Sequence, residues 1–283
     1  MIRIGLAGWG DHDRLYEKGT AARNKLKGYG TYFGVVEVDS SFYAIQSKAN
    51  YERWAADTPR DFGFVVKAYQ GMTGHQRGRS PFPDEETMFR AFRESIEPVG
   101  EAGKLKAVLF QYPPWFDCKK AHVDELRMTR ERMEGLPLAL EFRHQSWFEG
   151  EMREKTLAFM EREGWIHSIC DEPQAGAGSV PTVLQPTDKR LTIVRMHGRN
   201  AANWNGGGGP NWREVRYLYD YNEEELQGWK DNLAELENTT EEVCVIFNNN
   251  SGGHAAGNAA RLMTMLGMPV KPFAPQLEQL DLF

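Results

Sequence analysis

The segment "LPLALEFRHQSW", residues 136–147, joins an apolar strand to three ionisable side chains. Side chains two positions apart lie on the same face of a strand, so Glu141 and Arg143 share a face with Ala139. Charged groups on a buried face are costly unless they are paired or hydrogen-bonded. The segment therefore predicts a buried strand that ends in an ion pair, either structural or functional.

Seven further segments have the same strand-like character, and helical patterns lie between most of them. The strand-like segments are residues 2–8, 34–43, 61–69, 104–114, 136–142, 164–171, 190–198 and 241–250. Strands that alternate with helices pair in parallel through right-handed crossovers, which predicts a single (β/α)₈ barrel, a TIM barrel, over residues 1–270. A doubly wound open sheet is the alternative, but the first strand lacks the GxGxxG turn often found in that fold.

The composition is that of a globular chain of 283 residues with a formal net charge of -6. An acidic chain has no general basic coat, so any contact with nucleic acid would have to be local. The three cysteines are far apart and form no metal-binding or redox spacing, which is typical of a reducing compartment. We see no leader segment and no apolar run of the roughly 20 residues that span a bilayer, and expect a cytoplasmic protein without a membrane partner.

Polar side chains gather where the predicted strands end. They are Glu37, Asp39 and Ser41 on the second strand, Lys67 on the third, Gln111 on the fourth, Glu141 and Arg143 on the fifth, Asp171 on the sixth, Arg195 and His197 on the seventh, and Asn248 and Asn249 on the eighth. Barrel enzymes carry their active sites at these strand ends. We therefore expect a site at the barrel mouth, with structural ion pairs as the alternative for any one residue.

Several motifs in order also carry a resemblance to a known family. They include "VEVDSSFY", "FGFVVKA", "LFQYPP", "LALEFRHQSW", "RMHGR" and "IFNNNSGGHAAGNAARL". Over residues 4–266 the chain resembles the YecE-like family, known as domain-of-unknown-function family 72. The resemblance implies a TIM barrel, distantly similar to the xylose isomerase and endonuclease IV group, and implies no established reaction.

The acid–base candidates are carboxyl groups with one histidine and one lysine. Glu37 and Glu141 are the candidate general base and acid, because two carboxyl groups in different surroundings can hold different protonation states. His197 could transfer a proton at neutral pH, or it is a structural histidine under the "HGR" loop. Lys67 completes the predicted catalytic set, and Asp39 is expected to orient its neighbours.

The remaining candidates would bind the substrate. Arg143 and Arg195 are planar donors suited to phosphate or carboxylate. With Lys67 and the backbone donors of residues 248–254 they predict an anion site. The other predicted substrate-binding residues are Gln111, Asp171, Asn248, Asn249, Trp147 and Tyr43.

A divalent metal is a further candidate cofactor, although none is certain. Zinc, manganese or magnesium would use oxygen and nitrogen ligands, and the endonuclease IV group does use a metal cluster with such ligands. The candidate ligands are Glu37, Glu141, His144, Asp171, His197 and His254. No HxH or HExxH spacing occurs, and the arginines and Lys67 would compete for the same carboxylates.

Three long loops surround the predicted mouth. Residues 197–226 contain four successive glycines, 206–209, and five aromatic side chains, Trp204, Trp212, Tyr217, Tyr219 and Tyr221. These aromatics would either stack on a ligand or pack on the barrel rim. Asn222 and Glu225 form the pattern of a capping box at the start of a helix. Residues 69–83 bring His75, Arg77 and Arg79 to the same rim.

Three classes of function fit these residues. The first is an enzyme, a hydrolase or lyase, that acts on a phosphate-containing or nucleic-acid substrate. The second is an isomerase or hydrolase of a sugar or another small polar molecule. The third is a non-catalytic binding module. Base stacking beside a basic groove would favour the first, a small closed pocket the second, and a mouth whose ion pairs are all internally satisfied the third.

The predicted tail, residues 271–283, ends in Gln279, Leu280, Asp281, Leu282 and Phe283. Prolines at 269, 272 and 275 should hold the chain extended beyond the last helix. The final five residues are similar to the motif by which bacterial replication and repair proteins bind the DNA sliding clamp. They predict this clamp as a partner, which would tilt the function toward DNA repair. The alternative is that the apolar side chains fold back onto the barrel or onto a second subunit.

Overall fold

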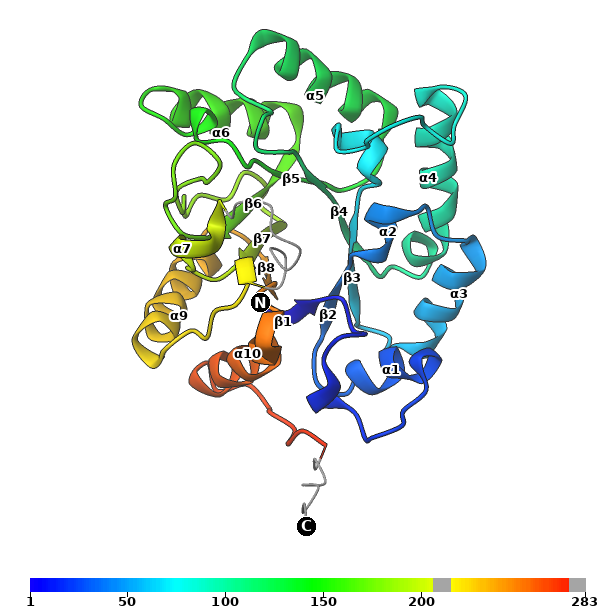
Figure 1. Ribbon diagram of the computed structural model, residues 1–283, viewed down its shortest axis with the longest axis vertical. Coiled ribbons are helices and arrows are strands. Elements are labelled where there is room, and N and C mark those ends of the chain that lie inside the picture. The colour runs from blue at the N-terminus through cyan, green and yellow to red at the C-terminus, as the bar shows by residue number, and fades with distance from the viewer. Residues whose placement is uncertain (206–214, 275–283) are drawn as a thin grey trace.

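The computed structural model describes residues 1–205 and 215–274, which fold into a closed barrel of eight parallel strands in chain order (Figure 1). The strands are β1 (Ile2–Ala7), β2 (Val35–Val38), β3 (Gly63–Lys67), β4 (Leu105–Gln111), β5 (Leu138–Glu141), β6 (Trp165–Asp171), β7 (Leu191–Met196) and β8 (Glu242–Phe247). β1 pairs with both β2 and β8, which closes the sheet. The prediction of a (β/α)₈ barrel is confirmed, and the open sheet is excluded.

Helices follow most of the strands and surround the barrel (Figure 1). They are α1 (Ala22–Tyr29), α2 (Ser40–Tyr43), α3 (Lys48–Asp57), α4 (Glu85–Glu101), α5 (Lys120–Arg132), α6 (Met152–Glu163), α7 (Ala201–Trp204), α9 (Glu223–Glu237) and α10 (His254–Met265). The predicted capping box is present at the start of α9, where Asn222 accepts from the Glu225 backbone and Glu225 accepts from the Asn222 backbone. Residues 172–190, all of them described, connect β6 to β7 without a helix.

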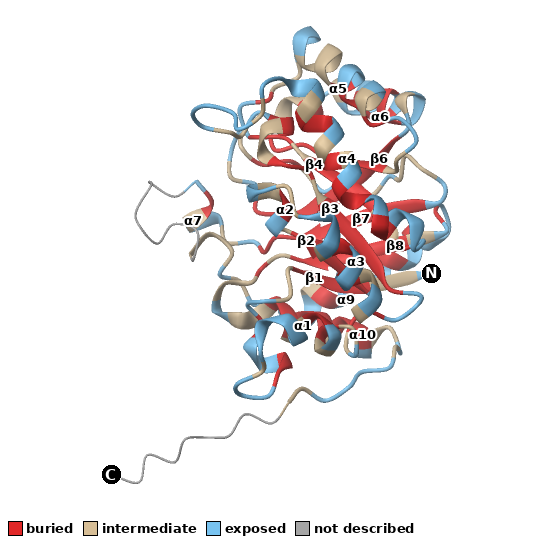
Figure 2. Cartoon of the chain, turned by 90° about the vertical axis from the view of Figure 1, so that its right-hand side faces the viewer, coloured by how far each residue is buried: buried red, intermediate tan, exposed pale blue. Residues whose placement is uncertain are grey.

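Alternation along the strands creates two apolar layers. The inner layer fills the barrel with small and branched side chains, including Val35, Leu109, Ala139 and Ile246. The outer layer packs the opposite strand faces against the helices. Figure 2 shows buried strands at the centre, with α2 and α7 at one end of the barrel and the N-terminus at the other. The mouth at the α2 and α7 end is where the predicted Glu37, Glu141, Arg143, Arg195 and His197 lie.

The chain leaves α10 along the outside of the barrel. Phe273 packs edge-on against Tyr32, and Lys271 donates to the Thr31 hydroxyl, so the start of the predicted tail lies beside the end of α1. The clamp-binding prediction for residues 279–283 lies outside the described residues. Within the described ranges, no helix has both the length and the apolar character required to cross a bilayer.

Candidate active site

Arg195 on β7 ties together two carboxylates from distant strands. Its Nε and Nη2 donate to the two oxygens of Glu37, at 2.8 and 2.6 Å. Its Nη1 donates to Glu141 at 2.7 Å and to the amide oxygen of Gln111 at 3.3 Å. The side chains of Arg195, Glu37 and Glu141 have no solvent exposure. Glu37 and Glu141 do therefore meet at the barrel axis, as the sequence predicted, but through an arginine.

Arg143 makes a second set of contacts around Glu141. Its Nη1 lies 3.1 Å from Glu141, 3.2 Å from Glu172 and 3.1 Å from Nε2 of His197. We call Glu37, Glu141, Arg143, Glu172, Arg195 and His197 the mouth cluster. Within this cluster two guanidinium groups face three carboxyl groups, and the charge of Arg216 also acts on Glu172. Buried charges of this kind are costly unless they are paired, so the protonation states of the three carboxyl groups depend on one another.

Glu172 is the member of the cluster that sequence reasoning missed. Ser168 and Cys170 alternate toward the barrel interior, and Glu172 continues that face one residue beyond the end of β6. Its Oε1 accepts from the backbone N–H of Val180, whereas Oε2 faces Arg143 at 3.2 Å and accepts no hydrogen bond from the part of the chain that the structure describes. Asp171, which we predicted instead, points to the outer side and accepts from Tyr221 and Arg199.

The three carboxyl groups have different proton affinities. Burial raises the pKa of Glu37 to about 7, against the opposing charge of Arg195. Burial likewise raises the pKa of Glu172 to about 7, against Arg143 and the Val180 N–H. Burial also acts to raise the pKa of Glu141, but Arg195, His197 and Arg143 together hold it well below its ordinary value. Glu141 is thus ionised at neutral pH, while Glu37 and Glu172 lie near their midpoints.

His197 is held as a neutral imidazole. Burial lowers its pKa to about 3, and the charges of Arg143 and Arg195 act in the same direction against the carboxylate of Glu141. Its Nδ1 lies 3.0 Å from the amide nitrogen of Asn248, as expected for two residues predicted to share the mouth. This environment favours hydrogen bonding by His197 over the proton transfer that we predicted from its ordinary pKa.

The loop after β7 encloses the cluster. Gly198 has φ of 83° and lets the chain turn sharply after His197, so that α7 lies over the mouth. The Trp204 ring is 1% exposed and lies 5.0 Å from the guanidinium of Arg143 and 4.2 Å from that of Arg216. Trp204 and Tyr221 are therefore buried rather than free to stack on a ligand. Trp212 and the glycines at 206–209 lie outside the described residues.

The predicted anion site would need cations that already have partners. Lys67 lies 3.5 Å from Asp39 and 4.9 Å from the Phe42 ring centre, while Arg143 and Arg195 contact the cluster carboxylates. A phosphate could bind these cations only if it replaced one of the carboxylates or if one of the carboxylates were protonated. The anion site stays a prediction.

Three predicted substrate-binding residues lie away from the mouth cluster. Trp147 is buried in the outer layer, stacked on Phe142, and its indole N–H donates to the Phe116 carbonyl. Asn249 is fully buried and donates to Tyr219 and Asn258 beside α10, which gives it a structural position. Tyr43 is 57% exposed on the rim. The positions of Trp147 and Asn249 correct the prediction, because both side chains make packing contacts and hydrogen bonds inside the protein.

One trio of ligand atoms is close enough to hold a metal among the described residues. Glu141, Cys170 and His197 offer atoms within 4.8 Å of one another. Of the six predicted ligands only two take part; His144 instead bonds to Ser146, and His254 lies beside Asp220. Burial also raises the pKa of the Cys170 thiol well above its ordinary value. With two guanidinium groups within 3.4 Å of the imidazole, these residues suit an ion-pair cluster better than a cation, and the metal stays a prediction.

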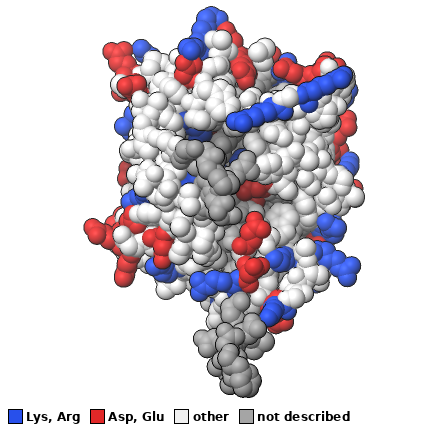
Figure 3. All heavy atoms as spheres, viewed as in Figure 1, with Lys and Arg blue, Asp and Glu red and all other residues white. Residues whose placement is uncertain are grey.

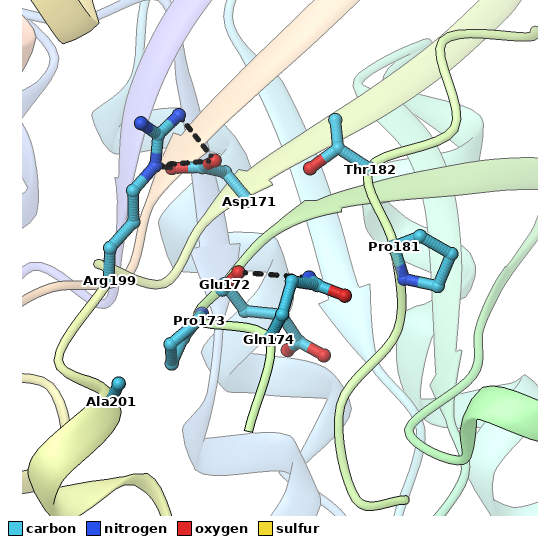
Figure 4. A pocket seen from close by; sticks show the side chains of 8 residues that line it. All are labelled: Asp171, Glu172, Pro173, Gln174, Pro181, Thr182, Arg199 and Ala201. Atoms are coloured by element: carbon cyan, nitrogen blue, oxygen red, sulfur yellow. Dashed lines mark hydrogen bonds and ion pairs between the residues drawn. The ribbon is translucent and has the colours of Figure 1, made fainter. Parts of the chain in front are cut away.

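A pocket of about 560 Å³ adjoins the cluster on the β6 and β7 side (Figure 4). Its walls are Asp171, Glu172, Pro173, Gln174, Pro181, Thr182, Arg199 and Ala201. Arg199 closes one side through its ion pair with Asp171 (Figure 4). The side chain of Glu172 has no exposure and its carboxyl group lies 3.2 Å from Arg143, so Glu172 belongs to both the pocket wall and the mouth cluster.

Charges of both signs surround the mouth. Figure 3 shows Lys, Arg, Asp and Glu side chains scattered over this face, with large uncharged areas between them and a short row of Lys and Arg at the upper right. A long duplex bound through its phosphates needs an extended basic surface. This face therefore suits a small or locally bound ligand better.

The fold and the cluster define a TIM barrel whose mouth is closed over buried acidic and basic side chains. The family described as "Protein of unknown function DUF72" matches residues 3–280. The chain is 55% identical to the UPF0759 protein YunF of Bacillus subtilis (strain 168), over the full length of both. The crystal structure of a DUF72 family protein from Enterococcus faecalis V583 matches with 35% identity and a TM-score of 0.90, covering 98% of this chain and 99% of that one. A DUF72 protein from Thermotoga maritima matches with 30% identity and a TM-score of 0.80, over 94% and 99% of the two chains. The chain belongs to the DUF72 family.

Proposed function

We propose that the protein is an enzyme, a hydrolase or lyase, that performs acid–base chemistry on a small phosphate-bearing molecule. The observation that carries this proposal is the enclosure of three carboxyl groups and two arginines at the strand ends of a TIM barrel. Replacing a buried ion pair by apolar residues often leaves stability unchanged or increases it. Stability alone is therefore a weak reason to bury this many charges.

Glu172 is the proposed proton donor or acceptor. It is the member of the mouth cluster that also lines the pocket, and its pKa of about 7 allows both protonation states at neutral pH. Glu141 stays ionised and fixes Arg143 and Arg195 in place. Glu37 supplies a second titrating carboxyl group on the far side of Arg195. Of the predicted acid–base pair, Glu141 thus serves as a fixed carboxylate, and Glu172 takes the acid–base role beside the pocket.

Arg143 supports the choice of an anionic substrate. When Glu172 takes up a proton, Glu141 is the one carboxylate that remains paired with Arg143 among the described residues, and Glu141 is shared with Arg195. If Glu37 is protonated as well, Glu141 is the one ionised carboxyl group of the mouth cluster beside two guanidinium groups, and a phosphate bound by Arg143 would offset the excess positive charge. Because Trp204 covers Arg143, access from the mouth requires α7 to move away, as loops do in many barrel enzymes.

Two other functions each have one observation in their favour. The pocket walls carry the hydrogen-bonding side chains of Asp171, Gln174 and Thr182, which suit a sugar and hence an isomerase or hydrolase of a small polar molecule. The internal pairing of Arg195 with Glu37 and Glu141 favours a binding module without catalysis.

The test is a substrate screen with matched variants. Wild-type protein, Glu172→Gln and Glu242→Gln are assayed against nucleotides, phosphorylated sugars, neutral sugars and abasic DNA. Glu242 is a comparable control because it pairs with Arg3 and Lys106 at the opposite end of the barrel. We expect turnover of a phosphate-bearing substrate by the wild type and Glu242→Gln, and its loss in Glu172→Gln. Equal turnover by all three, or turnover of neutral sugars only, contradicts the proposal. Elemental analysis of protein purified without chelators tests the metal prediction in parallel.

The sliding clamp is proposed as a partner through residues 279–283, on the sequence pattern alone. The described chain reaches Ala274 on the outer side of the barrel, which leaves the mouth unobstructed by this contact. Full-length protein should bind the bacterial clamp in a direct binding assay, and a form that lacks residues 279–283 should not. Equal binding by both forms, or binding by neither, would contradict the proposal that the clamp is a partner through these residues.

A further inference from the structure

Four aromatic rings form a row on the rim of the barrel, opposite the pocket. Tyr43 packs edge-on against Phe42 with ring centres 5.2 Å apart. Phe42 packs against His75 at 5.2 Å, and His75 against Trp115 at 5.9 Å. The rings come from the three segments that follow β2, β3 and β4, with Phe42 and Tyr43 in α2. These segments are far apart in the sequence, so folding brings the rings together. We call these four residues the aromatic row.

The ends of the aromatic row are open to solvent. Trp115 is 59% exposed, the highest value among the described large hydrophobic side chains, and Tyr43 is 57% exposed. For the aromatics of the loop after β7 the sequence left two alternatives, stacking on a ligand or packing on the barrel. Trp204 and Tyr221 of this loop are buried. Available stacking faces are therefore on the other side of the mouth. Burial lowers the pKa of His75 to about 4, and the charges of Lys67 and then Arg143 act in the same direction.

Positive charge accompanies the aromatic row in an otherwise acidic chain. Residues 40–47 and 68–83, which supply three of the rings, contain Arg77 and Arg79 and no acidic residue. Both arginines are exposed, and Lys67 lies 4.9 Å from the Phe42 ring centre. Figure 3 shows Lys and Arg side chains along the upper right of this face, where Figure 1 places the loop before α4. Asp39, which pairs with Lys67, and Asp117, two residues after Trp115, are the nearby carboxylates, and Arg77 and Arg79 are the exposed cations.

We propose that the aromatic row is a binding site for single-stranded nucleic acid, with bases stacked on Trp115 and Tyr43 and phosphates beside Arg77 and Arg79. Every base offers a flat face, and exposed aromatic rings beside cations are the usual means by which proteins bind single strands. This inference rests on the proposed function and deepens it, because it names nucleotides as the phosphate-bearing substrates. The short length of the row also fits an acidic protein, since only a local contact is required.

The experiment is a binding titration of a short, fluorescently labelled oligothymidylate by fluorescence anisotropy. Trp115→Ala and Tyr43→Ala should each weaken binding by roughly 5- to 100-fold, as expected for the loss of one stacked base. Arg77→Gln should weaken binding and reduce its dependence on salt. Met128→Ala is the control, because Met128 is 46% exposed on α5 and should leave binding unchanged. All four substituted side chains are exposed or on the rim, so folding should be preserved.

The outcome separates this inference from the proposed function. Glu242→Gln should bind the oligonucleotide as the wild type does, because Glu242 pairs with Arg3 and Lys106 at the opposite end of the barrel. Binding that depends on Trp115, with no turnover of any substrate, would retain the binding site and refute the enzyme. No binding by the wild type, equal binding by Trp115→Ala, or displacement of the oligonucleotide by a neutral oligosaccharide would overturn the inference.

Discussion

Replacing Glu172 by glutamine should make the protein more stable at alkaline pH. Burial raises the pKa of Glu172 from 4.5 to about 7, so the folded state binds a proton more tightly than the unfolded state does. The wild type therefore loses stability as the pH rises through the window from 4.5 to about 7. At 1.36 kcal/mol per pKa unit, this loss amounts to about 3 kcal/mol. Glutamine resembles the protonated carboxyl group in shape and does not ionise.

Urea denaturation of both proteins between about pH 4.5 and pH 8 measures the effect. The two stabilities should be similar at the acidic end, and Glu172→Gln should be more stable by about 3 kcal/mol at the alkaline end. The control is Glu242→Gln, since Lys106 and Arg3 lower the pKa of Glu242 against the effect of its burial. That variant should be less stable than the wild type at pH 8, with the difference shrinking as the pH falls. A Glu172→Gln protein that is destabilised at pH 8 would show that its carboxylate is a structural partner of Arg143.

Two further predictions concern the rest of the mouth cluster. Arg195→Met should lower the free energy of unfolding by about 3–5 kcal/mol, because it leaves Glu37 and Glu141 buried without their shared cation; a loss below about 1 kcal/mol in urea denaturation would argue against that pairing. Trp204→Ala should uncover the mouth and let a thiol reagent label Cys170, which is 2% exposed, while the more accessible Cys118 labels at the same rate as in the wild type; unchanged protection of Cys170 would mean that Trp204 does not close the mouth.

The sequence predicts the fold and the position of the site because both depend on periodic patterns. Eight apolar segments separated by helical ones define the barrel, and the polar ends of the strands place Glu37, Glu141 and Arg195 at one mouth. Side chains two apart share a face, so Glu172 could have been found by extending the alternation of Ser168 and Cys170 beyond Asp171. The predicted sixth strand ends at its first carboxylate, Asp171, which leaves Glu172 outside it.

Other features depend on contacts that no local pattern encodes. Trp147 stacks on Phe142 in the outer layer, and nothing in its neighbourhood in the sequence distinguishes this position from one at the mouth. The pairing of Arg195 with Glu37 joins residues 158 positions apart. The aromatic row likewise joins three separate segments of the chain. Nothing in the sequence "QYPPWFDC" indicates that Trp115 is exposed, and its exposure is seen only in the folded chain.

The central claim is that the mouth cluster holds carboxyl groups in different protonation states near neutral pH. The most direct measurement is an NMR titration of protein labelled with ¹³C at the glutamate carboxyl carbons. Two resonances should titrate with midpoints of about 7, one absent from Glu37→Gln and the other from Glu172→Gln, while the Glu141 resonance stays that of a carboxylate throughout. Titration of every glutamate near its ordinary value of 4.5 would contradict the account.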